Sequence, residues 1–192
     1  MDMVEAKLAQ VPAILSEVGI DLWLLFARES HTVHDPCFDL VVGGDVTWQS
    51  AFLLTPQGDR IAIVGSLDRA AVEMRGHYRD LIGYVGGISE ELRKVLTRLD
   101  PQRIAINFSL DDTMSDGMTH GMFLTLQKAL EGTPYGTRLE SSDRVVSALR
   151  GRKSTAEREC IRAACAETVA IFDRLTPRLH AGLTEKQVAA MI

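Results

Sequence analysis

The sequence of 192 residues is poor in cysteine and aromatic residues and contains no long apolar run. Its three cysteines are an odd number without CxxC spacing, which excludes a disulfide framework, so we expect reduced thiols in the cytoplasm. No stretch approaches the ~18 consecutive apolar residues that would span a bilayer. The first residues include Asp2 and Glu5 and lack the pattern of a secretory signal. We therefore expect no membrane partner.

Positive charge is also scarce, because 21 Lys and Arg residues face 26 Asp and Glu residues, for a net charge of −5. This balance argues against a nucleic-acid groove or an anionic lipid surface as the main partner. An apolar fraction of 46% and a charged fraction of 24% are typical of soluble globular proteins. The length suits one domain, or one domain with an appendage.

Several short catalytic and binding motifs are absent from the sequence. The glycines at 83, 86 and 87 lack a P-loop lysine and do not join a strand to a helix in the dinucleotide-binding pattern. There is no G-x-S-x-G nucleophile motif, and no pair of catalytic carboxylates stands out.

The acidic segment 111–120 imitates part of a calcium loop. Met114 and Phe123 occupy two positions where such a loop needs oxygen ligands, so the motif fails. We interpret Ser115 or Asp116 instead as the N-cap of a helix over residues 117–130.

Hydrophobic periodicity predicts an α/β domain. We expect strands at residues 20–27, 48–54, 60–64, 79–85, 103–107 and 137–139, and helices at 4–18, 67–75, 89–99, 117–130 and 143–149. Strands separated by helices, with one hairpin across residues 55–59, indicate a mixed β-sheet flanked by helices.

The last part of the chain has the clearest helix signals. Ser154 and Glu157 have capping-box spacing, and an apolar residue recurs every third or fourth position behind them. Pro177 should bend or end that helix, and Thr184 with Gln187 should begin another. Because the final helix stops at residue 192 while still apolar, we expect a truncated second domain.

This C-terminal stretch resembles the opening of the catalytic domain in pita-bread metallopeptidases, the Xaa-Pro aminopeptidases, prolidases and creatinases. The residues that carry the resemblance are Leu149, Arg150, Lys153, Ser154, Glu157, Ile161, Arg162 and Ala163, followed by Gly182, Leu183, Thr184, Glu185, Val188 and Ala189. Their order over about forty residues is more specific than any single match, and the α/β pattern upstream agrees with it.

The resemblance implies two parts. Residues 1–149 would form a creatinase/prolidase-type N-terminal domain with ribonuclease-H-like topology, and residues 150–192 would be the linker and first helices of a truncated catalytic domain. In this family the catalytic domain binds two divalent metal ions (Mn, Co or Zn) through Asp, Asp, His, Glu and Glu. No position of this chain corresponds to those ligands, so we assign it no catalytic residue, no metal ligand and no cofactor, and we expect it to be inactive alone.

The resemblance therefore predicts the non-catalytic domain of a metal-dependent Xaa-Pro peptidase. Such a domain would restrict the substrate cleft to short proline-containing peptides, contact its own catalytic domain and contribute to a homodimer. Two alternatives stay open: a standalone degenerate binding or scaffold domain, and the N-terminal domain of a creatinase-like amidinohydrolase.

The polar loop after the first strand contains the candidate contact residues. His31, His34 and Cys37 are spaced by three, which allows a metal or substrate site, but one short cluster is more typical of a solvent-facing loop. In the family this loop approaches the active site of a neighbouring subunit. On that ground alone we keep Arg28, His31 and His34 as candidate substrate contacts, although the loop departs from the aromatic and Gly-rich segment that many members carry there.

Overall fold

A computed structural model describes residues 2–192 of the chain. The chain divides into two compact units, one ending at Arg152 and one beginning at Lys153, and each is described by itself. The first unit is an α/β domain, and the second is helical. Within residues 2–192, no helix combines the length and the apolar character that crossing a bilayer requires.

The first unit is built on a mixed sheet, which has six strands within residues 2–192, in the order β4-β3-β2-β1-β5-β6. The strands are β1 (Leu22–Ala27), β2 (Ser50–Leu54), β3 (Arg60–Gly65), β4 (Asp80–Tyr84), β5 (Ile104–Ile106) and β6 (Leu139–Ser141). β2 is antiparallel to both β1 and β3, whereas β1 with β5, β3 with β4, and β5 with β6 are parallel pairs. The carboxyl ends of the other strands therefore share one edge of the sheet with the amino end of β2. The expected mixed sheet is confirmed.

The central strands are apolar because both faces of the sheet are covered. Every residue of β1 is buried, and its side chains alternate between two cores, with Trp23 and Leu25 in one and Leu24 and Phe26 in the other. A continuous apolar run, rather than an alternating one, is the pattern that a strand buried on both faces requires.

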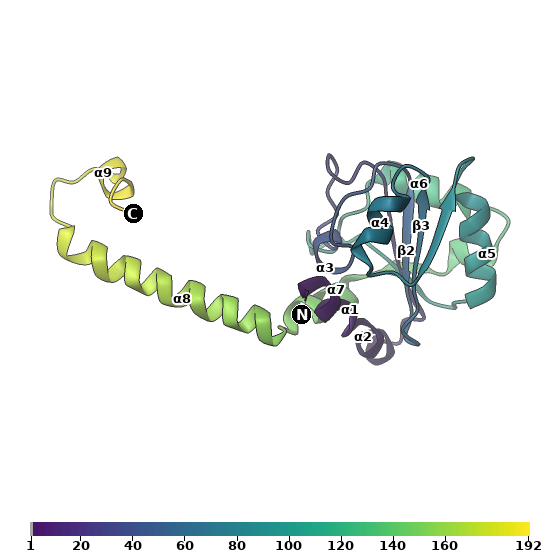
Figure 1. Ribbon diagram of the computed structural model, residues 1–192, viewed down its shortest axis with the longest axis horizontal. Helices are drawn as coiled ribbons and strands as arrows, with labels where there is room; N and C mark the ends of the chain where they lie inside the picture. Colours follow the sequence, from purple (N-terminus) through teal and green to yellow (C-terminus); the bar gives the residue numbers. More distant parts are fainter. Residues whose placement is uncertain (1) are drawn as a thin grey trace. The chain divides into compact units, whose positions relative to one another are not determined.

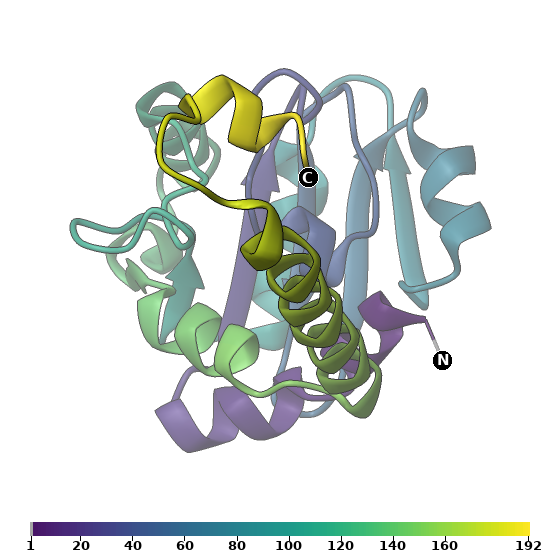
Figure 2. The same ribbon diagram turned by 90° about the vertical axis from the view of Figure 1, so that its left-hand side faces the viewer.

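Helices on the two faces come from different parts of the chain (Figure 1). One core contains side chains of α1 (Met3–Leu8), α2 (Val11–Val18), α3 (Phe38–Val41), α4 (Arg69–Arg75) and α7 (Asp143–Gly151). The other contains side chains of α5 (Ser89–Leu99) and α6 (His120–Ala129) and of the 3₁₀ turn η1 (Pro134–Thr137). Figure 2 shows α7, in green, beside α2, in purple, so the end of the domain packs against its beginning.

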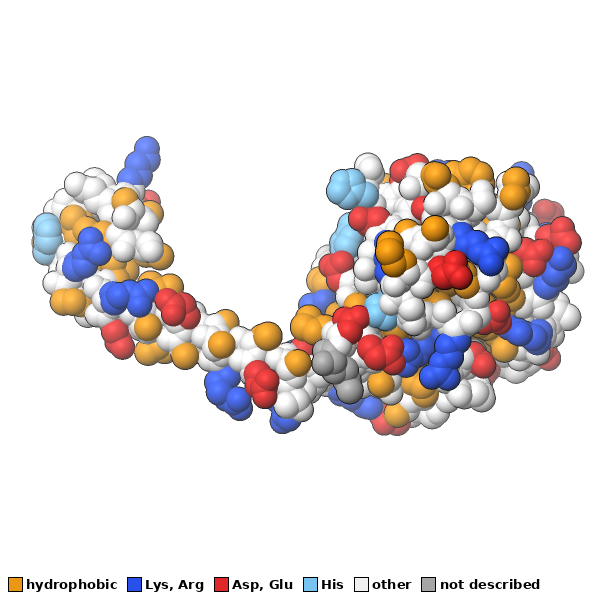
Figure 3. Space-filling view, in the orientation of Figure 1, with side chains coloured by type: hydrophobic (Ala, Val, Ile, Leu, Met, Phe, Trp, Pro, Cys, Tyr) orange, Lys and Arg blue, Asp and Glu red, His pale blue; other side chains and the backbone are white. Residues whose placement is uncertain are grey.

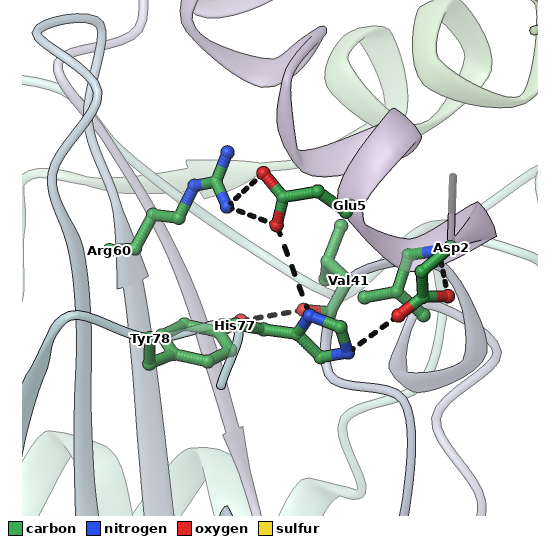
Figure 4. A network of polar contacts seen from close by, with 7 residues as sticks. Asp2, Glu5, Val41, Arg60, His77 and Tyr78 are labelled. Carbon is green, nitrogen blue, oxygen red and sulfur yellow. Dashed lines mark hydrogen bonds and ion pairs between the residues drawn. The ribbon is translucent and has the colours of Figure 1, made fainter. Parts of the chain in front are cut away.

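Polar contacts fasten α1 to the strand side of the domain (Figure 4). Arg60, at the start of β3, donates to both carboxylate oxygens of Glu5 at 2.9 and 2.7 Å. The ring of His77 lies between two carboxylates of this segment, 3.2 Å from Asp2 and 3.9 Å from Glu5. The buried Tyr78 hydroxyl donates to the carbonyl of Val41 at 2.9 Å.

Two helix boundaries differ from the sequence-based expectation. The expected helix over residues 4–18 is two helices, and Pro12 occupies the first turn of the second, where its missing N–H costs nothing. The expected N-cap of α6 was wrong: Thr119 caps the helix by accepting from the amide of Met122. Ser115 and Asp116 are engaged elsewhere in the loop, so the helix begins only after them.

The second unit begins with α8 (Thr155–Leu175), which continues into the 3₁₀ turn η2 (Thr176–Arg178) and is followed by α9 (Glu185–Ala189). Both expected capping boxes are present, at Ser154 with Glu157 and at Thr184 with Gln187. Leu175 is the buried residue of α8, while Ile161, Val169 and Phe172 are 47%, 59% and 61% exposed. Figure 3 shows orange apolar side chains along this helix, so its apolar stripe lacks a covering element in this unit.

Candidate functional site

The strand edge that carries most carboxyl ends contains two adjacent hollows. Open α/β sheets bind their ligands at such an edge, near the place where successive connections leave in opposite directions. Here the chain passes from β3 to β4 at one end of the strand order and from β5 to β6 at the other end. The two hollows share Val33 and Thr119 in their linings.

The first, the Trp48 hollow, has a volume of about 750 Å³. Its walls come from the loop after β1, the segment before β2, the end of β4 and the start of α6. The lining residues are Arg28, Glu29, Thr32, Val33, Thr47, Trp48, Gln49, Tyr84, Val85, Gly86, Gly87, Thr119 and Met122.

The aromatic wall of this hollow is held firmly in place. The buried carboxylate of Asp68 accepts from the backbone N–H groups of Thr47 and Trp48, both at 2.9 Å. The indole of Trp48 lies against Gly65, where a Cβ atom would stand 2.4 Å from the ring. Tyr84 packs beside the indole with ring centroids 6.0 Å apart.

Tyr84 is anchored through its hydroxyl, which donates to the carbonyl of Gln49 at 2.6 Å. Partial burial raises the pKa of Tyr84, and the neighbouring Asp68 carboxylate raises it further. The hydroxyl therefore stays protonated, and the wall is a fixed, neutral aromatic surface.

Two opposite charges lie on the loop side of the Trp48 hollow. Arg28 and Glu29 are exposed, and neither side chain forms a hydrogen bond or ion pair with any residue from 2 to 192. Glu29 has a φ of 46°, a left-handed conformation that is uncommon for a residue other than glycine. Its amide donates to the carbonyl of Thr47 at 3.0 Å, which ties this loop to the segment that carries the indole.

The second, the Phe108 hollow, has a volume of about 730 Å³ and a more apolar lining. It lies between the end of β5 and the start of α6. The lining residues are Val33, His34, Phe108, Ser109, Asp116, Gly117, Met118, Thr119, His120, Phe123, Gly136 and Leu139.

The three candidate contacts from the sequence do not meet in one place. Arg28 lines the Trp48 hollow, and His34 lines the Phe108 hollow with its Nε2 atom 3.3 Å from Asp39. His31 lines neither; it is 91% exposed, and its Nδ1 atom lies 3.5 Å from Asp45. Cys37 is buried and its thiol donates to the carbonyl of Met114, so the spacing of three residues produces no common site.

Across residues 2–192, no three or more His, Cys, Asp or Glu side chains come together in a way that could hold an ion. In the acidic loop, Asp112 accepts from the amide of Met114 and the hydroxyl of Ser115, while Asp116 accepts from the amide of Ser109. These hydrogen bonds are turn contacts, and those from Met114 and Ser115 lower the pKa of Asp112.

A network of buried hydrogen bonds lies at the carboxyl edge of the sheet, around Asn107. Asn107, directly after β5, accepts from the indole of Trp23 and the hydroxyl of Ser142 at 2.8 Å each, and it donates to Asp35 at 2.8 Å. Asp35 also accepts from the amide of Cys37 at 2.9 Å. Burial raises the pKa of Asp35, against the opposing effect of these hydrogen bonds.

Sequence patterns indicated Arg28 but not the aromatic wall of the Trp48 hollow. Trp48 falls within the strand expected at 48–54, Asp68 within the helix expected at 67–75, and Gly65 just after the strand expected at 60–64. Only their meeting in space gives them a shared role.

No protein-family model and no curated protein matches the sequence. Solved structures do resemble the fold. Dipeptidase PepE from Mycobacterium ulcerans is 22% identical with a TM-score of 0.63, over 99% of this chain and 48% of that one. Xaa-Pro dipeptidase from Bacillus anthracis is 17% identical with a TM-score of 0.59, over 98% of this chain and 47% of that one. The chain thus spans about half the length of these proteins.

An isolated domain also matches. The creatinase/prolidase N-terminal domain of an X-Pro dipeptidase from Streptococcus pyogenes is 17% identical with a TM-score of 0.54, over 77% of this chain and 99% of that one. At these identities the likeness concerns the fold. The chain has the α/β fold of a creatinase/prolidase N-terminal domain, as the resemblance in its sequence led us to expect.

Proposed function

We propose that this chain is the non-catalytic N-terminal part of a metal-dependent Xaa-Pro peptidase of the cytoplasm. Residues 1–149 are the N-terminal domain, and residues 150–192 are the linker and first helices of the catalytic domain. The observation that carries the proposal is the pair of coverages. The isolated N-terminal domain from Streptococcus pyogenes is matched over 99% of its own length, by 77% of this chain. Dipeptidase PepE is matched over 48% of its own length, by 99% of this chain.

In this proposal the catalytic domain performs hydrolysis. Its two divalent metal ions (Mn, Co or Zn) would be held by residues beyond Ile192, because the residues described here offer no cluster that fits them. We therefore derive no catalytic step from this chain, and we expect the 192 residues alone to leave Xaa-Pro peptides uncleaved.

The proposed contributions of the chain are to wall the substrate cleft, to limit it to short proline-containing peptides and to take part in a homodimer. Arg28, His31 and His34 are its candidate substrate contacts. Arg28 is best supported, since it is an exposed cation without a protein partner among residues 2–192 at the edge where such folds bind ligands.

The decisive experiment is to sequence the reading frame beyond the codon for Ile192. We expect about another domain of ~200 residues that contains Asp, Asp, His, Glu and Glu in that order. Continuation without those residues would favour a creatinase-like amidinohydrolase or a degenerate relative. A stop codon would contradict the proposal and favour a standalone α/β scaffold.

The contact role of Arg28 is tested in the complete enzyme. Arg28→Gln should raise KM for a proline-containing dipeptide by about ten- to a hundredfold and leave kcat nearly unchanged, because a charged hydrogen bond is worth about 1.5–3 kcal/mol. Lys128→Gln, at an exposed position of α6 outside both hollows, is the matched control. Equal KM values for the two variants would remove Arg28 from the substrate contacts.

A further inference from the structure

The Trp48 hollow combines three features that no structural role of its own explains. It has a preformed aromatic wall, an unpaired guanidinium and an unpaired carboxylate, all within one lining. Its volume of about 750 Å³ is in the range of small-molecule sites.

The wall is built in advance of any ligand. Asp68 is 7% exposed and uses both carboxylate oxygens to fix the backbone before β2, and Gly65 leaves room for the indole to lie flat on the strand. Trp48 nevertheless remains 37% exposed. A rigid, half-exposed indole is a surface on which another aromatic ring stacks with little loss of conformational entropy.

The charged side chains of Arg28 and Glu29 are exposed and are not neutralised by a neighbouring residue. Arg28 and Glu29 are neighbours in the chain, yet their side chains pair neither with each other nor with another residue from 2 to 192. Glu29 adopts its positive φ of 46° at the same place. Strained backbone of this kind concentrates at ligand sites, where the surrounding structure holds it.

Two carboxylates beside the hollow, outside its lining, argue against a phosphate ligand. The Gly86–Gly87 turn leads into α5, but the first turn of that helix contains Glu90 and Glu91. These carboxylates oppose the attraction that a helix start otherwise has for anions.

We propose that the Trp48 hollow binds a free aromatic α-amino acid. The ring stacks on Trp48, the carboxylate pairs with Arg28 and the ammonium group pairs with Glu29. This inference stands on the geometry of the hollow and does not depend on the proposed peptidase parent, although Arg28 appears in both.

The test uses the intrinsic fluorescence of the 192-residue chain. Of its two tryptophans, Trp23 is fully buried and Trp48 is exposed, so a ligand in the hollow changes the Trp48 signal. The chain is titrated with L-phenylalanine, with 3-phenylpropionate, which lacks the ammonium group, and with phenethylamine, which lacks the carboxylate. We expect saturable quenching by phenylalanine and about tenfold weaker binding of the other two, since each loses one charged contact.

Matched variants assign the contacts. Arg28→Gln and Glu29→Gln should each weaken phenylalanine binding about tenfold, and Gly86→Leu should abolish it by filling open space, since a Cβ there meets no atom within 4 Å. Lys128→Gln should bind like the parent chain. Trp48→Phe should lose the fluorescence change, and amide chemical shifts of Gly86 and Gly87 report binding in that variant. Far-UV circular dichroism confirms folding of each.

Three outcomes would overturn the proposal. The first is equal affinity for all three compounds, which would leave a general apolar surface. The second is unchanged affinity in both Arg28→Gln and Glu29→Gln. The third is no change in fluorescence or in the amide shifts up to the solubility limit of phenylalanine. None of these results bears on whether a catalytic domain follows Ile192, so the two proposals fail separately.

Discussion

At the scale of single residues, the carboxyl edge of the sheet depends on polar side chains that are buried and hydrogen-bonded to one another. Asn107 is 0% exposed and joins Trp23, Ser142 and Asp35 through its side-chain amide. Asp35 in turn fixes the start of α3 through the amide of Cys37. Such networks hold a loop in one arrangement because leaving any member unpaired in the interior costs free energy.

Gly117 packs so closely against Asp35 that the structure has no room for a side chain at this position. A Cβ atom there would lie 2.2 Å from the carboxylate carbon of Asp35. We expect Gly117→Ala to lower the free energy of unfolding by about 1–3 kcal/mol through overpacking, measured by urea denaturation. Gly121→Ala is the control: its Cβ meets nothing within 4 Å, and it lies in α6, so it should stabilise the protein by about 0.5–1 kcal/mol. A Gly117→Ala protein as stable as the parent would show that the loop containing Asp35 can shift without a cost in free energy, which would contradict the prediction.

Asp35 should also leave a signature in the pH dependence of stability. Burial raises its pKa above the value of about 3.9 in an unfolded chain, so the folded state holds the proton more tightly. Its contribution to stability is therefore present at low pH and is lost as the pH rises from about 4 through the folded pKa.

The measurement is the difference in the free energy of unfolding between the parent chain and Asp35→Asn across the acid range. Glu5 and Asp112 have lowered pKa values and act in the opposite sense, but both proteins contain them, so their contributions cancel in the difference. We expect the parent chain to lose stability relative to the variant as the pH rises. Parallel curves would contradict a raised pKa at Asp35.

At the scale of elements, the end of α7 is held by a lysine from the first helix. The Nζ atom of Lys7 donates to the carbonyls of Leu149 at 2.7 Å and Arg152 at 3.0 Å, and Lys7 is 3% exposed. The last carbonyls of a helix have no partner within it, so a cation there satisfies them and also complements the helix dipole.

We expect Lys7→Met to lower the free energy of unfolding by about 1.5–3 kcal/mol, because it removes charged hydrogen bonds and leaves the buried carbonyl of Leu149 unsatisfied. Lys128→Met, on the exposed side of α6, should stay within about 0.5 kcal/mol of the parent. Thermal and urea denaturation of both variants measure this difference. If both lysines were equally dispensable, the contact between Lys7 and α7 would have no stabilising role.

At the scale of the whole molecule, the two units differ in what covers their apolar side chains. The first unit buries two cores, one on each face of its sheet. In the second, Ile161, Val169 and Phe172 of α8 are exposed. Exposed apolar stripes of this kind drive association.

We therefore expect the 192-residue chain to associate in solution at micromolar concentrations more strongly than a chain that ends at Arg152, which should keep the same melting temperature for the α/β unit. Analytical ultracentrifugation and calorimetry measure the two properties. Phe172→Glu, within the full chain, should also reduce association. A full chain that sediments as a monomer across the concentration range would show that the exposed apolar residues of α8 do not cause association.

The elements themselves follow largely from local pattern. The continuous apolar run at 20–27 predicts β1, and the Ser154 and Thr184 capping boxes predict the starts of α8 and α9, because these signals act between residues close in the chain. The start of α6 was misplaced for the converse reason. Ser115 and Asp116 are suitable caps by type, but their side chains are engaged by Asp112 and Ser109 in the folded loop.

The sequence by itself therefore determined the α/β class, the helical character of the last forty residues and the resemblance to creatinase/prolidase N-terminal domains. Only the tertiary structure decided which side chains share a site. It separates Arg28, His31 and His34, which are close in sequence, and it brings Trp48, Asp68 and Tyr84 together from three segments. Periodicity and caps depend on neighbours in the chain, whereas a hollow depends on strand order and direction, which are settled by packing across the whole sheet.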